Sequence, residues 1–318
     1  MLKYILQRIL LAIPVIIGVS ILVFFIIHLI PGDPIQIMFG KNPDPVQIEK
    51  IQHLYGLDRP LWQQYFVWIG NFLKGDWGTS IRLDQPVRKM VLSRLPRTAT
   101  LSILGIITSL IIAIPAGIIS AVKHNSKTDL GITSFTLLLI SVPSFWLGIL
   151  LIIIFSVYLN ILPATGYVSP SEDFCRSIRS MIMPTLSLAA AVSATLTRVL
   201  RSSMLEVLGQ DYVMLARVKG NSERRVLFIH TLRNSLIPLM TIVGMEVGYL
   251  LGGEIIIERV FAFPGMGSLL ISAIYQRDYP LIQATILVFA ILVVMVNIIT
   301  DLFYSLADPR IKITKRVK

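Results

Sequence analysis

Residue types that catalyse reactions or bind metals are few and scattered in this chain. None of its four histidines has another histidine three or four residues away, so we interpret them as surface or packing residues. Cys175 is the single cysteine, which excludes an internal disulfide and a cysteine cluster for zinc. The sequence has no phosphate-binding G-x-x-x-x-G-K-[ST] segment and no nucleophile–base pair. We therefore expect a protein that is not an enzyme, with no catalytic, metal or cofactor-binding residues of its own.

One carboxylate is unusual because of the apolar sequence around it. Glu246 lies near the middle of the run 236–257, which is long enough to cross a bilayer. A charge at that depth is costly, so Glu246 is expected to face protein or a water-filled path. Two interpretations stay open: a residue that lines a solute path, or a buried partner for an arginine or a backbone group.

The segment 203–238 is polar and strongly basic, although apolar runs flank it on both sides. Its sequence predicts a short helix over 212–219 and a second helix from about 223 to Asn234. These boundaries depend on two helix-ending glycines and two N-cap residues; they are Gly209, Gly220, Asp211 and Ser222.

Helical spacing predicts that one face of the short helix carries Tyr212, Leu215, Ala216 and the stem of Lys219. The small Ala216 and the stop at Gly220 would let this face enter a groove on another protein. The alternative is a solvated basic loop, and these residues alone favour neither interpretation.

The composition indicates an all-α membrane protein. Hydrophobic residues make up 54% of the 318 residues and charged residues 15%, and the mean hydropathy is +0.75. A hydrocarbon core of about 30 Å needs about 20 apolar residues per helix. Six runs are long enough: about 9–30, 99–122, 131–159, 182–202, 236–257 and 282–305. The third run is longer than a span needs, so we expect it either to tilt or to be interrupted at Pro143.

The net charge of +11 does not indicate nucleic acid, because the basic residues lie beside these runs. The positive-inside rule places both termini in the cytoplasm of a multi-pass protein of the cell membrane. We expect an N-terminal anchor over 1–30, an extracytoplasmic helical segment over 31–98, a five-span core over 99–305 and a basic cytoplasmic tail over 306–318.

The extracytoplasmic segment is expected to contain helices over 45–55, 60–73 and 86–95, with Thr98 capping the second span. The middle helix either lies on the membrane or packs on the spans, or it forms a platform for an external solute-binding protein. In the fifth span, Gly244, Gly248 and Gly252 form a small-xxx-small row that predicts close helix packing. The last outer loop is a candidate gate because its backbone is irregular; its residues include Phe261, Pro264, Gly265 and Gly267.

The chain resembles the inner-membrane permease subunits of binding-protein-dependent ABC importers for dipeptides, oligopeptides, nickel and related solutes. The resemblance rests on motifs in order along nearly the whole chain: MLKYILQRILLAIP at the start, IPGDP (30–34), YGLDRPLWQQY (55–65), GDWGTS (75–80), DYVMLARVKG (211–220), HTLRNSLIP (230–238), ERVFAFPGMG (258–267), RDYPLIQ (277–283) and DPRI (308–311).

This resemblance implies the type I ABC importer permease fold, with 211–238 as the loop that docks on the ATP-binding subunit. The coupling residues it implies are Asp211, Tyr212, Ala216, Arg217, Lys219, Gly220, His230, Arg233 and Asn234. The run Met214-Leu215 departs from the family's more basic pattern, so one basic contact of the short helix is expected to be missing.

The implied partners are a paralogous permease, two ABC ATPases that carry ATP and Mg²⁺, an external solute-binding protein and membrane lipid. Peptides are the implied solutes, with nickel or another metal chelate as the alternative. A secondary transporter with Glu246 in an ion relay, and a scaffold whose basic loop binds a partner or anionic lipid, are the competing classes.

Overall fold

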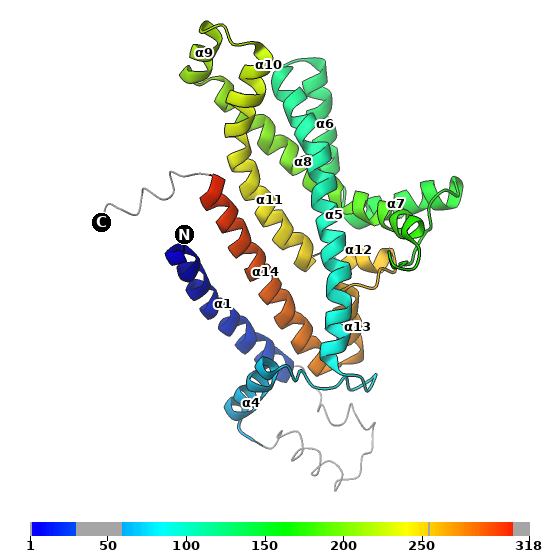
Figure 1. Cartoon of the computed structure of the whole chain (residues 1–318). Coiled ribbons are helices and arrows are strands. Elements are labelled where there is room, and N and C mark those ends of the chain that lie inside the picture. Colours follow the sequence, from blue (N-terminus) through cyan, green and yellow to red (C-terminus); the bar gives the residue numbers. More distant parts are fainter. Residues whose placement is uncertain (1, 30–58, 254, 308–318) are drawn as a thin grey trace. The chain divides into compact units, whose positions relative to one another are not determined.

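The computed structural model describes residues 2–29, 59–253 and 255–307, with side chains described over 6–25, 59–250 and 255–302. Within these ranges the chain is helical apart from turns and one isolated β-bridge between Thr79 and Pro86 (Figure 1). The helix expected over 45–55 and nearly all of the basic tail lie outside the described residues.

Five of the described helices are long and apolar enough to cross a membrane. They are α1 (Leu2–Leu29), α5 (Val87–Val122), α8 (Phe174–Leu208), α11 (Arg233–Gly253) and α14 (Tyr279–Ala307), and the crossing segment that contains α11 begins at Glu223. These helices correspond to five of the six predicted runs.

The remaining predicted run, over 131–159, is broken at Pro143, which is one of the two outcomes expected for it. α6 (Lys127–Ser141) ends there, and the chain continues as α7 (Ser144–Leu151) and the π-helical η1 (Ile152–Tyr158). The two parts meet at an angle of 99° and form either a broken span or a re-entrant loop. Pro143 is the N-cap residue of α7, where its missing N–H costs no hydrogen bond.

The separate helix predicted over 86–95 is wrong, because α5 begins at Val87 and continues through Pro96 to Val122. Proline is tolerated in such a helix where neighbouring groups satisfy the freed backbone carbonyl. Thr98 therefore does not cap the second span. Its hydroxyl instead accepts a hydrogen bond at 2.8 Å from the backbone N–H of Met266, the first residue of α13 (Met266–Gln276).

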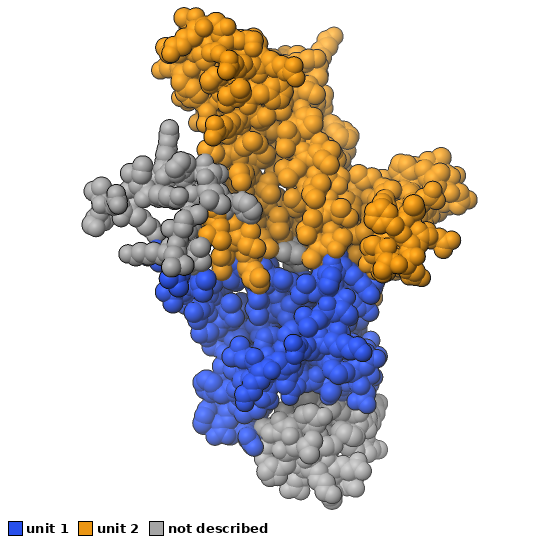
Figure 2. Space-filling model, in the orientation of Figure 1, with its two compact units in different colours: residues 1–98, 264–294 blue, residues 99–263, 295–318 orange. Residues whose placement is uncertain are grey.

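The chain forms two compact units (Figure 2): unit 1 contains residues 1–98 and 264–294, and unit 2 contains residues 99–263 and 295–318. In unit 1, α4 (Leu61–Lys74) begins after Pro60 and ends at the left-handed Gly75, in agreement with the predicted helix over 60–73. α4 packs on α1: the Tyr65 and Ser20 hydroxyls lie 2.8 Å apart, and the Tyr65 ring meets Phe24 edge-on. α4, the middle helix of the segment predicted to be extracytoplasmic, thus lies against α1.

Two of the quoted motifs also meet in unit 1. The hydroxyl of Ser80, from GDWGTS, donates a hydrogen bond to the carboxylate of Asp278, from RDYPLIQ. The Ile81 backbone N–H donates to the same fully buried carboxylate at 3.3 Å. These bonds compensate Asp278 for its lost hydration.

In unit 2, α8 is the central helix, and α6, α7 and α11 pack against it. Its buried side includes Leu188, Leu196 and Leu200. Gly117 of α5 packs against Leu200 so closely that an added Cβ would lie 3.0 Å from the leucine side chain. This packing holds α8 in place up to its last turns, from which the short helix described next projects.

Candidate functional site

The short helix predicted after α8 is present as α9 (Asp211–Val218). α8 ends at Leu208, with Gly209 as its C-cap residue, as expected. The N-cap of α9 is Gln210 and not Asp211, and no side chain caps the helix. Asp211 is instead the first helical residue, where its negative charge favours the helix N-terminus.

The far end of α9 is closed by Gly220, as predicted. Gly220 has a φ of +82°, a left-handed conformation that glycine adopts without a steric penalty. Its backbone N–H donates to the Arg217 carbonyl at 2.9 Å, and the Asn221 N–H donates to the Ala216 carbonyl at 3.3 Å. This pair of bonds is a Schellman motif, which satisfies two carbonyls that the helix leaves free.

One side of α9 is attached to its own chain by a small apolar cluster. The cluster consists of Val213, Ala216 and Val226, with Val207 and Leu208 of α8 packed against it. Ala216 is 7% exposed, so it does not share the outward face that helical spacing predicted for it. The predicted outward position of Ala216 is wrong because α9 packs on Val226 and on the end of α8, and this contact places Ala216 on the buried side.

The opposite side of α9 is apolar and open. Four large side chains are between 46% and 80% exposed there: Tyr212, Met214, Leu215 and Val218. Arg217 and Lys219 are exposed beside them, and the Arg217 guanidinium contacts the Glu223 carboxylate at 2.9 Å. The predicted pair Tyr212 and Leu215 therefore lies on the open face.

The helix that follows does not stop at Asn234. α10 (Glu223–Arg225), the π-helical η2 (Val226–Leu232) and α11 run without a break. Ser222 occupies the N-cap position, but its side chain makes no capping bond. The Asn234 amide donates to the Tyr212 hydroxyl at 3.0 Å and to the His230 carbonyl at 2.8 Å. Arg233 is exposed and His230 half-buried, so the implied coupling residues lie on both connected helices.

The path and packing candidates of α11 lie in different surroundings. Glu246 and Gly248 are half-buried, whereas Gly244 is buried. A Cβ added to Gly244 would lie 1.9 Å from the Thr300 side chain of α14, so a side chain cannot be accommodated there. Gly252 lies among the residues whose burial is not described.

The gate candidates are divided between the two compact units. Phe261 and Phe263 follow α12 (Ile255–Val260) and are 2% and 1% exposed in the core of unit 2. The Gly166 N–H donates to the Phe261 carbonyl at 2.9 Å. Pro264, Gly265 and Gly267 belong to unit 1, where Gly265 is the N-cap residue of α13 (Met266–Gln276). A gate at this turn stays a prediction.

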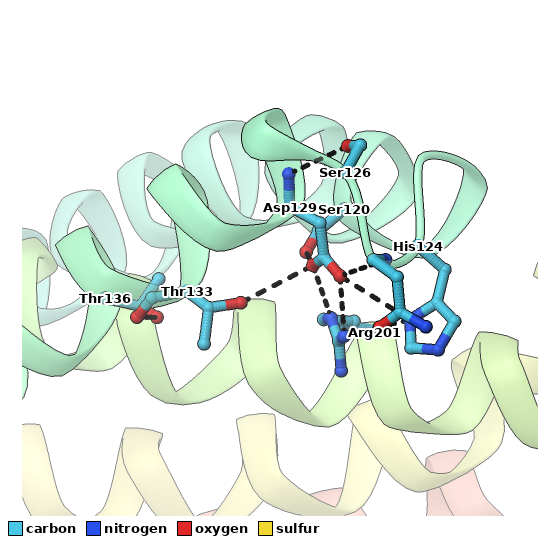
Figure 3. A network of polar contacts seen from close by, with 8 residues as sticks. Ser120, His124, Ser126, Asp129, Thr133, Thr136 and Arg201 are labelled. Carbon is cyan, nitrogen blue, oxygen red and sulfur yellow. Dashed lines mark hydrogen bonds and ion pairs between the residues drawn. The ribbon is translucent and has the colours of Figure 1, made fainter.

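Sequence reasoning missed a polar network in unit 2 (Figure 3), centred on Asp129 of α6 and Arg201 of α8. The Arg201 Nε and Nη2 atoms lie 2.7 and 2.8 Å from the two Asp129 oxygens. His124, interpreted above as a surface or packing residue, lies 3.1 Å from Arg201 Nη2 through its Nδ1. The two charged residues are 72 positions apart in the sequence.

Family comparison identifies the chain. Residues 113–313 match the model for the binding-protein-dependent transport system inner membrane component, and residues 1–102 match the model for the N-terminal part of such membrane components. The chain belongs to this permease family. The membership confirms the resemblance that the motifs indicated, and it places the chain in the inner membrane as a transport subunit dependent on a binding protein.

Relatives match along almost the full length. The oligopeptide transport system permease protein AppB of Bacillus subtilis is 42% identical and aligns over 98% of this chain and 100% of its own. The di/tripeptide permease DppB of Pseudomonas aeruginosa is 40% identical, and the dipeptide permease DppB of Escherichia coli K12 is 38% identical. Each aligns over 98% of this chain and 99% of its own.

Solved structures show that the fold is that of type I ABC importer permeases. The MetNI methionine ABC transporter, in an inward-facing form, matches with a TM-score of 0.59 and 14% identity over 71% of this chain and 100% of its own. An amino acid ABC transporter matches with a TM-score of 0.52 and 14% identity over 68% of this chain and 94% of its own. At this identity the likeness concerns the fold alone.

Proposed function

We propose that this chain is the permease subunit of an ATP-driven importer of dipeptides or oligopeptides. Peptide permeases that are 38% to 42% identical over nearly the whole chain support this substrate class. These relatives do not favour nickel. Among the described residues, no group of three or more histidine, cysteine, aspartate or glutamate side chains is arranged to hold a metal ion.

α9 is proposed as the site at which an ATPase subunit acts. The observation that carries this proposal is the division of α9 into two sides, one buried on its own chain and one with four exposed apolar side chains. An apolar face next to basic residues fits a groove on a partner protein. Closure of the ATPases on ATP would displace α9 and, through it, the spans.

The proposed assembly contains this chain, a paralogous permease, two ABC ATPases and an external solute-binding protein, within membrane lipid. ATP and Mg²⁺ would bind to the ATPases. The excess of basic residues in loops on the α9 side supports a cytoplasmic location for both termini and for this loop.

Substitutions on the open face of α9 test the docking role. Val218→Asp and Leu215→Asp place a charge on the face without affecting the buried cluster. We expect both variants to insert normally, to lose copurifying ATPase and to lose ATP-driven uptake of a labelled dipeptide in proteoliposomes. Ala216→Trp would not be a clean test, because Ala216 is buried within this chain.

Ser222→Ala is the matched control, because Ser222 is exposed in the same loop and its side chain makes no capping bond. It should retain both ATPase and uptake. Normal uptake by Val218→Asp and Leu215→Asp would contradict docking at α9. Uptake that survives ATP depletion in the unmodified assembly would contradict the importer itself.

The role of Glu246 is tested by Glu246→Gln. A carboxylate in the path should favour peptides that carry a cationic side chain, so this variant should reduce uptake of a lysine-containing dipeptide more than uptake of a neutral one. An equal reduction for both peptides would assign Glu246 a structural role.

A further inference from the structure

Three helices of unit 2 meet at one carboxylate. Asp129 lies in the first turn of α6 and is 4% exposed. Its oxygens accept hydrogen bonds from the Ser120 hydroxyl of α5, the Asn125 backbone N–H of the α5–α6 turn and the Arg201 guanidinium of α8. Thr133, one turn further along α6, donates more weakly at 3.4 Å. The carboxylate is therefore saturated with donors from three separate elements.

The Arg201 guanidinium fixes the orientation of the Asp129 carboxylate in addition to neutralising its charge. Its Nε and Nη2 atoms bond separate oxygens of Asp129, in the two-pronged arrangement that fixes both planes relative to each other. Figure 3 shows the Arg201 side chain reaching from α8 toward the carboxylate, with His124 beside it. A buried ion pair is weak evidence for stability, since the attraction is offset by lost hydration, but it specifies one arrangement of its helices.

Arg201 lies close to the place where α9 packs on α8. Arg201 lies two turns before the end of α8 at Leu208, and α9 packs against Val207 and Leu208 at that same end. A force on α9 therefore enters α8 within a few residues of the ion pair. From there the pair connects to the start of α6 and the end of α5.

We propose that Asp129 and Arg201 are positioning residues that make α5, α6 and the end of α8 move together when α9 is displaced. This inference rests on the proposed function of α9 and adds the residues through which its displacement reaches the neighbouring helices. Without the pair, α9 and the end of α8 would move while α5 and α6 lagged behind. ATP would then be hydrolysed with less solute imported.

The experiment uses the full assembly with its binding protein in proteoliposomes and measures labelled dipeptide imported per ATP hydrolysed. Arg201→Lys keeps the charge but cannot form the two-pronged contact. We expect its import per ATP to fall by about two- to thirty-fold, the range by which network substitutions alter coupling, while ATP hydrolysis continues. Arg198→Lys is the matched control: Arg198 is exposed one turn earlier on α8, and no described residue pairs with it.

A second variant separates positioning from stability. Asp129→Asn combined with Arg201→Gln removes both charges, so neither is left buried and unpaired. We expect its thermal midpoint to lie closer to that of the unmodified protein than the midpoint of Asp129→Asn alone, while import per ATP stays low. Recovery of import per ATP together with the midpoint would overturn the proposal.

Other outcomes are equally decisive. A parallel loss of import and ATP hydrolysis in Arg201→Lys, or no loss at all, overturns the inference. If Arg201→Lys does not assemble, Ser120→Ala removes one donor and retains the ion pair; it should lower import per ATP by less, and an unchanged ratio would count against the proposal. Absence of ATP-driven import in the unmodified assembly would instead overturn the proposed function.

Discussion

Two short, irregular segments of unit 2 contrast in burial: the α9 segment and the turn over 261–263. Each contains a residue with positive φ, Gly220 at +82° and Ala262 at +49°. Phe261 and Phe263 are 2% and 1% exposed and belong to the main core, whereas Val218 of α9 is 80% exposed. The turn belongs to the main hydrophobic core of unit 2, whereas α9 packs only on a small separate cluster of apolar side chains. Substitutions in the turn should therefore change the free energy of unfolding, and substitutions of exposed α9 residues should change binding to another protein.

The largest effect on stability is expected from Phe263→Ala. Phe263 is fully buried, and the Tyr167 ring meets it edge-on at 5.2 Å between centroids. Removing a buried phenyl ring leaves a cavity and costs about 3–5 kcal/mol. Thermal unfolding in detergent should show a clearly lower midpoint. An unchanged midpoint would mean that the turn is not part of the core, and the contrast with α9 would fail.

A smaller and local effect is expected from Val213→Ala. Val213 is fully buried, but in the cluster beneath α9. The lost methyl groups correspond to about 2 kcal/mol, and because the cluster is small, the loss should appear as local opening. Hydrogen exchange should accelerate over 211–226 and stay unchanged in α8 before Leu200. Acceleration throughout unit 2 would show that α9 and the core unfold as one body.

The smallest effect is expected from Gly220→Ala. A side chain in the left-handed conformation costs about 1 kcal/mol, and no described atom lies within 4 Å of an added Cβ. The Schellman bonds should weaken, and exchange of the Asn221 amide should accelerate. Gly209→Ala is the control, because Gly209 has a φ of −81° that alanine also adopts. Equal acceleration in both variants would count against the left-handed requirement.

Local signals predicted much of this structure, and distant partners account for the rest. Gly220 and Pro143 mark helix ends through their backbone geometry, which can be predicted from the single residue. The orientation of Ala216 is not local, because it depends on Val226 and on the end of α8. The helix predicted over 86–95 ends just before Pro96, whereas α5 continues through this proline as one long apolar helix.

In the candidate site, too, some features follow from the local sequence and others depend on residues far away in the sequence. The position and length of α9 followed from its sequence, and so did its connection to a basic helix. The pairing of Asp129 with Arg201 did not, because two charges 72 residues apart carry no sequence signal of contact. The roles assigned to Glu246 and to the turn over 261–267 stay predictions, since they concern a solute and a partner subunit.

The bend at Pro143 also affects the lipid around this subunit. The 15 residues of α6 rise about 22 Å as an α-helix, which is less than the hydrocarbon thickness of about 30 Å. Beyond the bend, Trp146 and Tyr158 are exposed, and both residue types prefer the level of the headgroups. A membrane with shorter acyl chains would match the length of α6 better. The free-energy cost of hydrophobic mismatch around this subunit should therefore depend on acyl-chain length.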